Sequence, residues 1–67
     1  MRNYTAKELF DGACEGKQYR LGTVDIVPVG IKENSYVINF RRMDTQELIG
    51  QFECDANGVV KCEEVVG

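Results

Sequence analysis

The chain has 67 residues, 43% hydrophobic and 28% charged, which fits one small globular domain and excludes a disordered chain. Its net charge of −3 is spread along the sequence, which disfavours non-specific binding to nucleic acid. No apolar run approaches the roughly 18 residues of a membrane span, and no apolar signal-peptide core follows Met1. We therefore expect one domain over residues 1–67 with no nucleic-acid or membrane partner, located in the cytoplasm if the chain begins at its natural start.

The first predicted element is a short helix. Thr5 and Glu8 have the spacing of a capping box, in which each side chain accepts a hydrogen bond from the other residue's backbone N–H. Tyr4 and Leu9 are placed to form a hydrophobic staple across this start. Gly16 is well placed to end the helix in a left-handed conformation.

The predicted helix has one apolar face. About ten helical residues are marginal alone, so this face must pack against another element. Gly12 lies within the helix and costs roughly 1 kcal/mol relative to alanine, and the sequence supplies no reason for it. The residues of the apolar face are Ala6, Leu9, Phe10, Ala13 and Cys14.

The rest of the chain predicts β-strands. Residues 19–29 are rich in β-branched side chains, and Pro28 indicates an edge strand or a strand end. Residues 30–34 predict a turn, residues 35–43 a strand, and residues 44–46 another turn. Residues 47–54 and 59–66 then predict a closing hairpin. The expected fold class is α+β, with one N-terminal helix packed on an antiparallel sheet of three to four strands.

The turn between the last two strands has a strong signal. Asp55 and Gly58 occupy the first and fourth positions of a type I turn, with Gly58 able to adopt a positive φ in a bulge. A three-residue loop would place Glu53 opposite Lys61, whereas a two-residue Asn57–Gly58 turn would place Glu53 opposite Cys62. The first arrangement pairs opposite charges and keeps apolar residues together, so we predict it.

Strand alternation divides the predicted sheet into two faces. One face, covered by the helix, carries Tyr36, Ile38, Phe40, Leu48, Phe52, Cys54, Val60 and Cys62. The other face is mostly polar but also carries Val37, Ile49 and Val65. A sheet with a single helix leaves this second face open, so these three residues are candidates for a partner contact or a homodimer contact.

No motif in the sequence predicts catalysis or a bound cofactor. The chain has no histidine, Ser35 is its only serine, and no phosphate-binding glycine motif is present. The carboxylates are scattered in a way typical of a solvated surface. We therefore expect no catalytic, cofactor-binding or metal-binding residues and no enzymatic activity.

The three cysteines, Cys14, Cys54 and Cys62, allow three interpretations. The first is that all three are small core residues in a reducing compartment. The second is a reactive or redox-sensing thiol, and the third is a disulfide or a metal site. A metal site would need a fourth ligand besides the three cysteines. A disulfide between Cys54 and Cys62 would have to join residues that the predicted register places diagonally, beyond the usual reach of the bond.

Arg41 and Arg42 form the only adjacent basic pair. One interpretation is a solvated strand end. The other is a contact for a small anion or a partner, and Arg41 is the candidate residue for that contact.

The order of a helix, antiparallel strands and a strand–Asp-x-x-Gly–strand hairpin resembles the PepSY-like domains. The residues that carry the resemblance are the helix 6–10, the strand 36–40 and the segment 52–60. The resemblance implies a non-catalytic domain, often extracytoplasmic, that binds or restrains a protein partner. The three cysteines and the absence of a signal segment depart from that setting, and no binding residues can be transferred.

These observations lead to three functional hypotheses. The first is a non-enzymatic protein-binding or regulatory module that uses the exposed sheet face or the edge strand near Pro28. The second is a small phage- or mobile-element-type inhibitor of a host enzyme, since such proteins are often short and acidic. The third is an oligomeric ligand-binding protein or enzyme with a pocket between subunits.

Overall fold

The computed structural model describes residues 1–65, which form one helix and six strands. The elements in chain order are β1 (Arg2–Thr5), α1 (Ala6–Cys14), β2 (Gln18–Leu21), β3 (Val24–Lys32), β4 (Ser35–Arg42), β5 (Leu48–Cys54) and β6 (Val59–Val65). The α+β class and the antiparallel sheet are confirmed. The prediction of three to four strands is wrong, because the sequence pattern missed β1 and merged β2 with β3. The predicted end of the last strand at Val66 lies outside the described residues.

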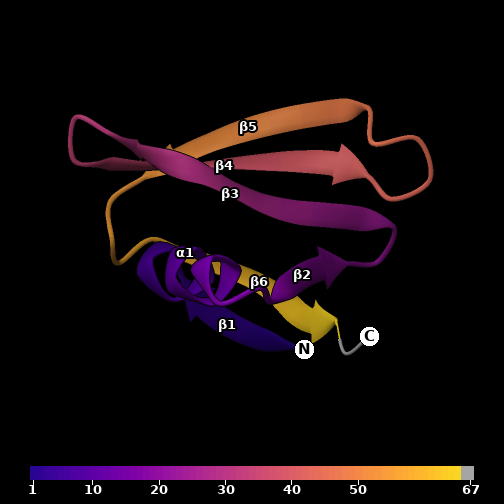
Figure 1. The fold of residues 1–67 in the computed structure, drawn as a ribbon, viewed down its shortest axis with the longest axis horizontal. Coiled ribbons are helices and arrows are strands. Elements are labelled where there is room, and N and C mark those ends of the chain that lie inside the picture. The colour runs from indigo at the N-terminus through magenta and orange to yellow at the C-terminus, as the bar shows by residue number, and fades with distance from the viewer. Residues whose placement is uncertain (66–67) are drawn as a thin grey trace.

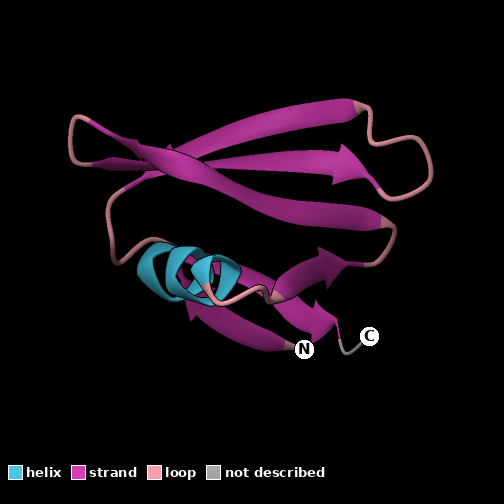
Figure 2. Ribbon diagram, viewed as in Figure 1, coloured by secondary structure: helices cyan, strands magenta, loops and turns pink. Residues whose placement is uncertain are grey.

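All six strands belong to one antiparallel sheet, in the order β1-β6-β2-β3-β4-β5. The sheet curls, so that β3, β4 and β5 lie in the upper half of Figure 1 while β1, β6 and β2 lie below with the helix. β5 and β6 follow each other in the chain, yet they stand in different halves of the sheet and do not pair. Figure 2 shows that α1 covers part of this curled sheet.

The helix begins and ends as the sequence predicts. The Thr5 N–H donates to Glu8 Oε1 at 2.9 Å, and the Glu8 N–H donates to Thr5 Oγ1 at 3.1 Å, which completes the capping box. Gly16 has a φ of +88°, and the Lys17 N–H donates to the Gly12 carbonyl at 2.9 Å. This last bond closes a Schellman motif, for which a left-handed glycine is the usual residue.

Residues 19–29 contain a turn that the sequence prediction missed. The turn at Gly22, which has a φ of +62°, separates β2 from β3. β3 lies between β2 and β4 and is therefore not an edge strand. Pro28 nevertheless lies beyond the residues of β3 that pair with β2, so its missing N–H breaks no bond to that strand.

The turn after β5 forms, but it does not make the predicted hairpin. The Gly58 N–H donates to the Asp55 carbonyl at 3.1 Å, and Gly58 has no positive φ. The Ala6 N–H donates to the Gly58 carbonyl at 2.8 Å, and the Lys7 N–H donates to the Ala56 carbonyl at 3.3 Å. The carbonyls of this turn therefore accept hydrogen bonds from the first turn of the helix, and the turn connects one half of the sheet to the other.

The pairing of β6 excludes both registers considered from the sequence. Residues Arg2–Thr5 pair with β6, placing Asn3 opposite Lys61 and Tyr4 opposite Val60. Glu53 instead faces Val37 on β4. The prediction of Glu53 opposite Lys61 is wrong because β1 takes the edge of β6 that the predicted hairpin assigned to β5. Gly58 is still required, because a Cβ there would lie 2.6 Å from Cys54 Cβ.

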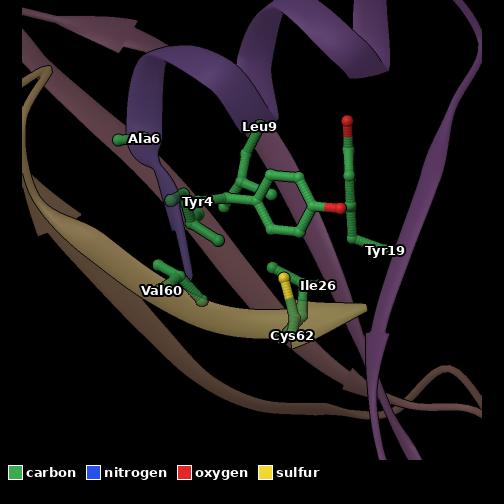
Figure 3. Close-up of a cluster of buried hydrophobic side chains, with 8 residues drawn as sticks. Tyr4, Ala6, Leu9, Tyr19, Ile26, Val60 and Cys62 are labelled. Carbon is green, nitrogen blue, oxygen red and sulfur yellow. The ribbon is translucent and has the colours of Figure 1, made fainter. Parts of the chain in front are cut away.

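The core lies between the helix and one face of the sheet, called here the inner face. Tyr4 and Tyr19 meet edge to face beneath the helix, with ring centroids 5.1 Å apart, beside Leu9 (Figure 3). Tyr19 is buried. The core residues are Tyr4, Ala6, Leu9, Tyr19, Ile26, Ile38, Val60 and Cys62.

The core explains Gly12. This glycine is buried where the helix meets Tyr19, and a Cβ at position 12 would overlap the Tyr19 hydroxyl oxygen. The buried positions of the helix are therefore Ala6, Leu9 and Gly12, whereas Cys14 is exposed. Glycine at position 12 allows the helix to pack directly against Tyr19, which outweighs its cost in helix propensity.

Candidate binding groove

The inner face extends beyond the helix into an apolar groove of about 520 Å³. β5 and β6 form its two sides, and β2, β3 and β4 form its floor. Four lining residues are large and exposed: Leu21 at 40%, Ile49 at 56%, Phe52 at 38% and Val59 at 59%. The complete lining is Leu21, Val24, Ile26, Phe40, Ile49, Phe52, Val59, Val60 and Lys61.

The groove is continuous with the core, because Ile26 and Val60 belong to the buried cluster and also line the groove. Val59 and Lys61 flank Val60 on β6 and border the groove from the strand edge. Phe40 faces Ile26 across the β3–β4 pair, and its ring stacks on that of Phe52 with centroids 6.4 Å apart. The prediction that Phe40 and Phe52 share a face is thus confirmed, but the helix does not cover Phe52.

β5 forms the free edge of the sheet beside this groove. Pro28 has no N–H and faces Ile38, which assigns that pair to the non-hydrogen-bonded set between β3 and β4. The backbone groups of Ile38 therefore point toward β5, where Ile38 faces Phe52. By alternation, the N–H and C=O groups of Gln51 and Glu53 point away from β4, along the open edge.

The charge along this edge is acidic. Residues 43–60 contain no lysine or arginine. Within this segment Asp44 is bound by Arg42 at 3.1 Å, but none of the ion pairs among residues 1–65 includes Glu47 or Glu53. Two carboxylates that form no ion pair within residues 1–65 thus lie near the two ends of β5.

Polar contacts support the floor of the groove from the outer face of the sheet. The Arg20 Nε–H donates to Asp25 Oδ1 at 2.9 Å, and the Gln46 Nε2–H donates to Asp25 Oδ2 at 2.8 Å. These two bonds, Arg20's first, hold the pKa of Asp25 below its ordinary value. They connect β2 and β3 to the segment between β4 and β5, which carries Glu47.

The structure places the four predicted partner-contact residues apart. Arg41 is half-buried on β4, and its Nη1–H donates to the Gln46 carbonyl at 2.9 Å. Val37 faces Gly30 and Glu53 on β4, while Val65 lies three strands away on β6, where it faces Gln18. Ile49 alone lines the groove, where an irregularity in the β4–β5 register adds one residue to β5.

The sequence prediction missed Leu21, Phe52 and Val59 as surface residues of the groove. The predicted β5–β6 hairpin left no space between these two strands, and the prediction placed Phe52 on the face that the helix covers. Leu21 directly precedes Gly22, and a turn at this glycine is the signal that would have placed Leu21 at a strand end.

The three cysteines have different environments and are all free thiols. Burial raises the pKa of the Cys62 thiol, and burial with the nearby Asp55 carboxylate raises that of Cys54. Cys14 is exposed on the helix, so the prediction that all three are core residues is wrong for Cys14. Among residues 1–65, no group of three or more Cys, Asp or Glu side chains is placed to hold a metal ion.

No known protein family, no curated protein and no solved structure matches this chain. The part of the chain that the structure describes contains no helix long and apolar enough to cross a membrane.

Proposed function

We propose that this protein is a non-catalytic protein-binding or regulatory module and that the apolar groove between β5 and β6 is its binding surface. The observation that carries the proposal is the apolar groove beside the core, around which Leu21, Ile49, Phe52 and Val59 are exposed. Exposed apolar surface gathered in one place is typical of a contact site for another protein.

Two further features agree with this proposal. Three free thiols, two of them at least partly buried, are compatible with the reducing conditions of the cytoplasm, where we expect the module to act. The acidic edge beside an apolar surface favours a polypeptide partner over a nucleic acid.

The experiment is affinity capture from the cells that make this protein, with wild type compared with Ile49→Lys. Lysine places a charge in the groove and should abolish capture of the partner. The matched control is Ile31→Lys, because Ile31 is 54% exposed and lies on β3 outside the groove lining. The captured protein is then identified, purified and tested for direct binding to the same three proteins.

The proposal requires a polypeptide that binds wild type and Ile31→Lys but not Ile49→Lys. Equal binding by all three proteins would assign the partner to another surface. If none of them binds a polypeptide while a small molecule co-purifies with wild type, the proposed function is wrong.

A further inference from the structure

We infer that the partner segment is an extended peptide that adds to the free edge of β5 as a strand, with alternating apolar residues and with lysine or arginine near its ends. This inference rests on the proposed function and specifies the chemistry of its partner. It depends on three properties of one edge: open backbone groups, adjacent apolar surface and unneutralised carboxylates.

The backbone of β5 supplies the hydrogen bonds. Gln51 and Glu53 direct their N–H and C=O groups along the open edge, as the pairing of Pro28 with Ile38 and of Ile38 with Phe52 requires. An added strand bonds such groups regardless of its own sequence.

The groove favours partner strands that carry apolar side chains. Phe52 and Ile49 lie on β5 itself and line the groove, so a strand beside β5 directs alternate side chains into the same space. Its other side chains point to the outer face, where polar residues are tolerated. The pattern expected in the partner is therefore apolar residues at every second position.

The carboxylates beside β5 favour partner strands that carry cationic residues. Glu47 and Glu53 lie near opposite ends of β5, and neither belongs to an ion pair within residues 1–65. A strand added to β5 in either direction passes both carboxylates. Lysine or arginine near each end of that strand would neutralise them, whereas acidic residues there would be repelled.

The same charges disfavour a second copy of this chain as the occupant. Two copies of β5 overlap along the whole strand when they pair antiparallel about a two-fold axis at Gln51. This register places Glu47 of each copy opposite Asp55 of the other, so it opposes like charges twice across the interface, which is unfavourable. An axis at Phe52 places Glu53 opposite Gln51 and avoids this repulsion, but it shortens the overlap to residues 50–54.

The test selects binders from a displayed library of random dodecapeptides on immobilised wild-type protein, with Ile49→Lys used to remove peptides that bind elsewhere. We expect the selected peptides to carry lysine or arginine near both ends of an alternating apolar run. Exchange of the backbone amide protons is then followed by NMR with a synthetic selected peptide. The amides of Gln51 and Glu53 should become protected on binding.

Two variants separate the backbone contribution from the charge contribution. Gln51→Pro removes an outward N–H without removing a β4–β5 bond and should weaken binding by about tenfold or more. Gln51→Ala is its control, because it removes the same side chain and keeps the N–H. Glu47→Lys with Glu53→Lys should also weaken binding by about tenfold and should favour peptides with acidic ends.

The outcomes distinguish this inference from the proposed function. Selected peptides without basic residues, or amides of Gln51 and Glu53 that exchange equally fast with and without peptide, would overturn strand addition. In that case groove-dependent capture of a protein would still support the proposed function. Light scattering that shows a dimer dissociated by Gln51→Pro would instead identify a second copy as the occupant and would overturn the inference.

Discussion

The inner face of the sheet has a covered half and an open half, and the two halves are built from the same kinds of residue. In the covered half, Leu9 from the helix packs against Ile38 and Tyr19, all of which are buried. In the open half, Ile49 and Phe52 line a groove and are exposed. The difference shows that one short helix covers enough of the sheet to make a core and leaves the remaining apolar residues exposed.

A matched pair of isoleucines tests this difference most strongly. Ile38 is 1% exposed and Ile49 is 56% exposed. Ile38→Ala should lower the free energy of unfolding by about 3 kcal/mol, because it leaves a cavity in the core. Ile49→Ala should change it by less than about 0.5 kcal/mol. Urea unfolding followed by circular dichroism measures both, and equal losses would show that the groove is part of the core.

Gly12→Ala tests how closely the helix approaches the sheet. Helix propensity alone predicts a gain of roughly 1 kcal/mol. The overlap with the Tyr19 hydroxyl predicts instead a net loss of about 1–2 kcal/mol, because the added Cβ must displace the ring. Urea unfolding in the Tyr19→Phe background is the control, since removing the hydroxyl should reduce the loss. A more stable Gly12→Ala protein would show that the covered half is not closely packed at this point.

Acid unfolding tests the polar support behind the open half and should give the smallest effect. The pKa of Asp25 lies below its ordinary value of 3.8, so the ionised carboxylate stabilises the folded state. That contribution is complete above the ordinary value and is lost as the pH falls through the lowered pKa. Asp25→Asn should therefore lower stability at pH 7 by less than about 1 kcal/mol and flatten its dependence on pH below about 4. A mutant whose stability changes with pH as that of wild type does would show that Asp25 does not contribute.

The elements with local signals were predictable from the sequence. The capping box at Thr5 and Glu8, the end of the helix at Gly16 and the shared face of Phe40 and Phe52 each depend on residues close in sequence or on simple alternation. The same reasoning failed for β6, which was predicted to pair with β5 but pairs with β1 and β2. The turn at residues 55–58 was recognised, but nothing local indicates that its carbonyls bind the helix start instead of closing a hairpin.

The sequence prediction missed the groove because it paired β5 with β6. Ile49 was a candidate from the sequence because it is apolar on a mostly polar sheet face, and the structure places it in the groove lining. Phe52 was assigned to the face that the helix covers, because the predicted hairpin placed it opposite Cys62. Val37, Val65 and Arg41 do not meet Ile49 at one surface, so their partner contacts remain separate predictions.

The pairing of β1 with β6 also has a kinetic consequence. Arg2 faces Cys62, and the helix start at Ala6 is bonded to Gly58, so the N-terminal segment is completed only by the other end of the chain. Contacts so distant in sequence require closure of a long loop, which slows folding relative to a chain of mostly local contacts. The helix should therefore gain lasting protection only when β6 docks, in the same event that forms the second side of the groove.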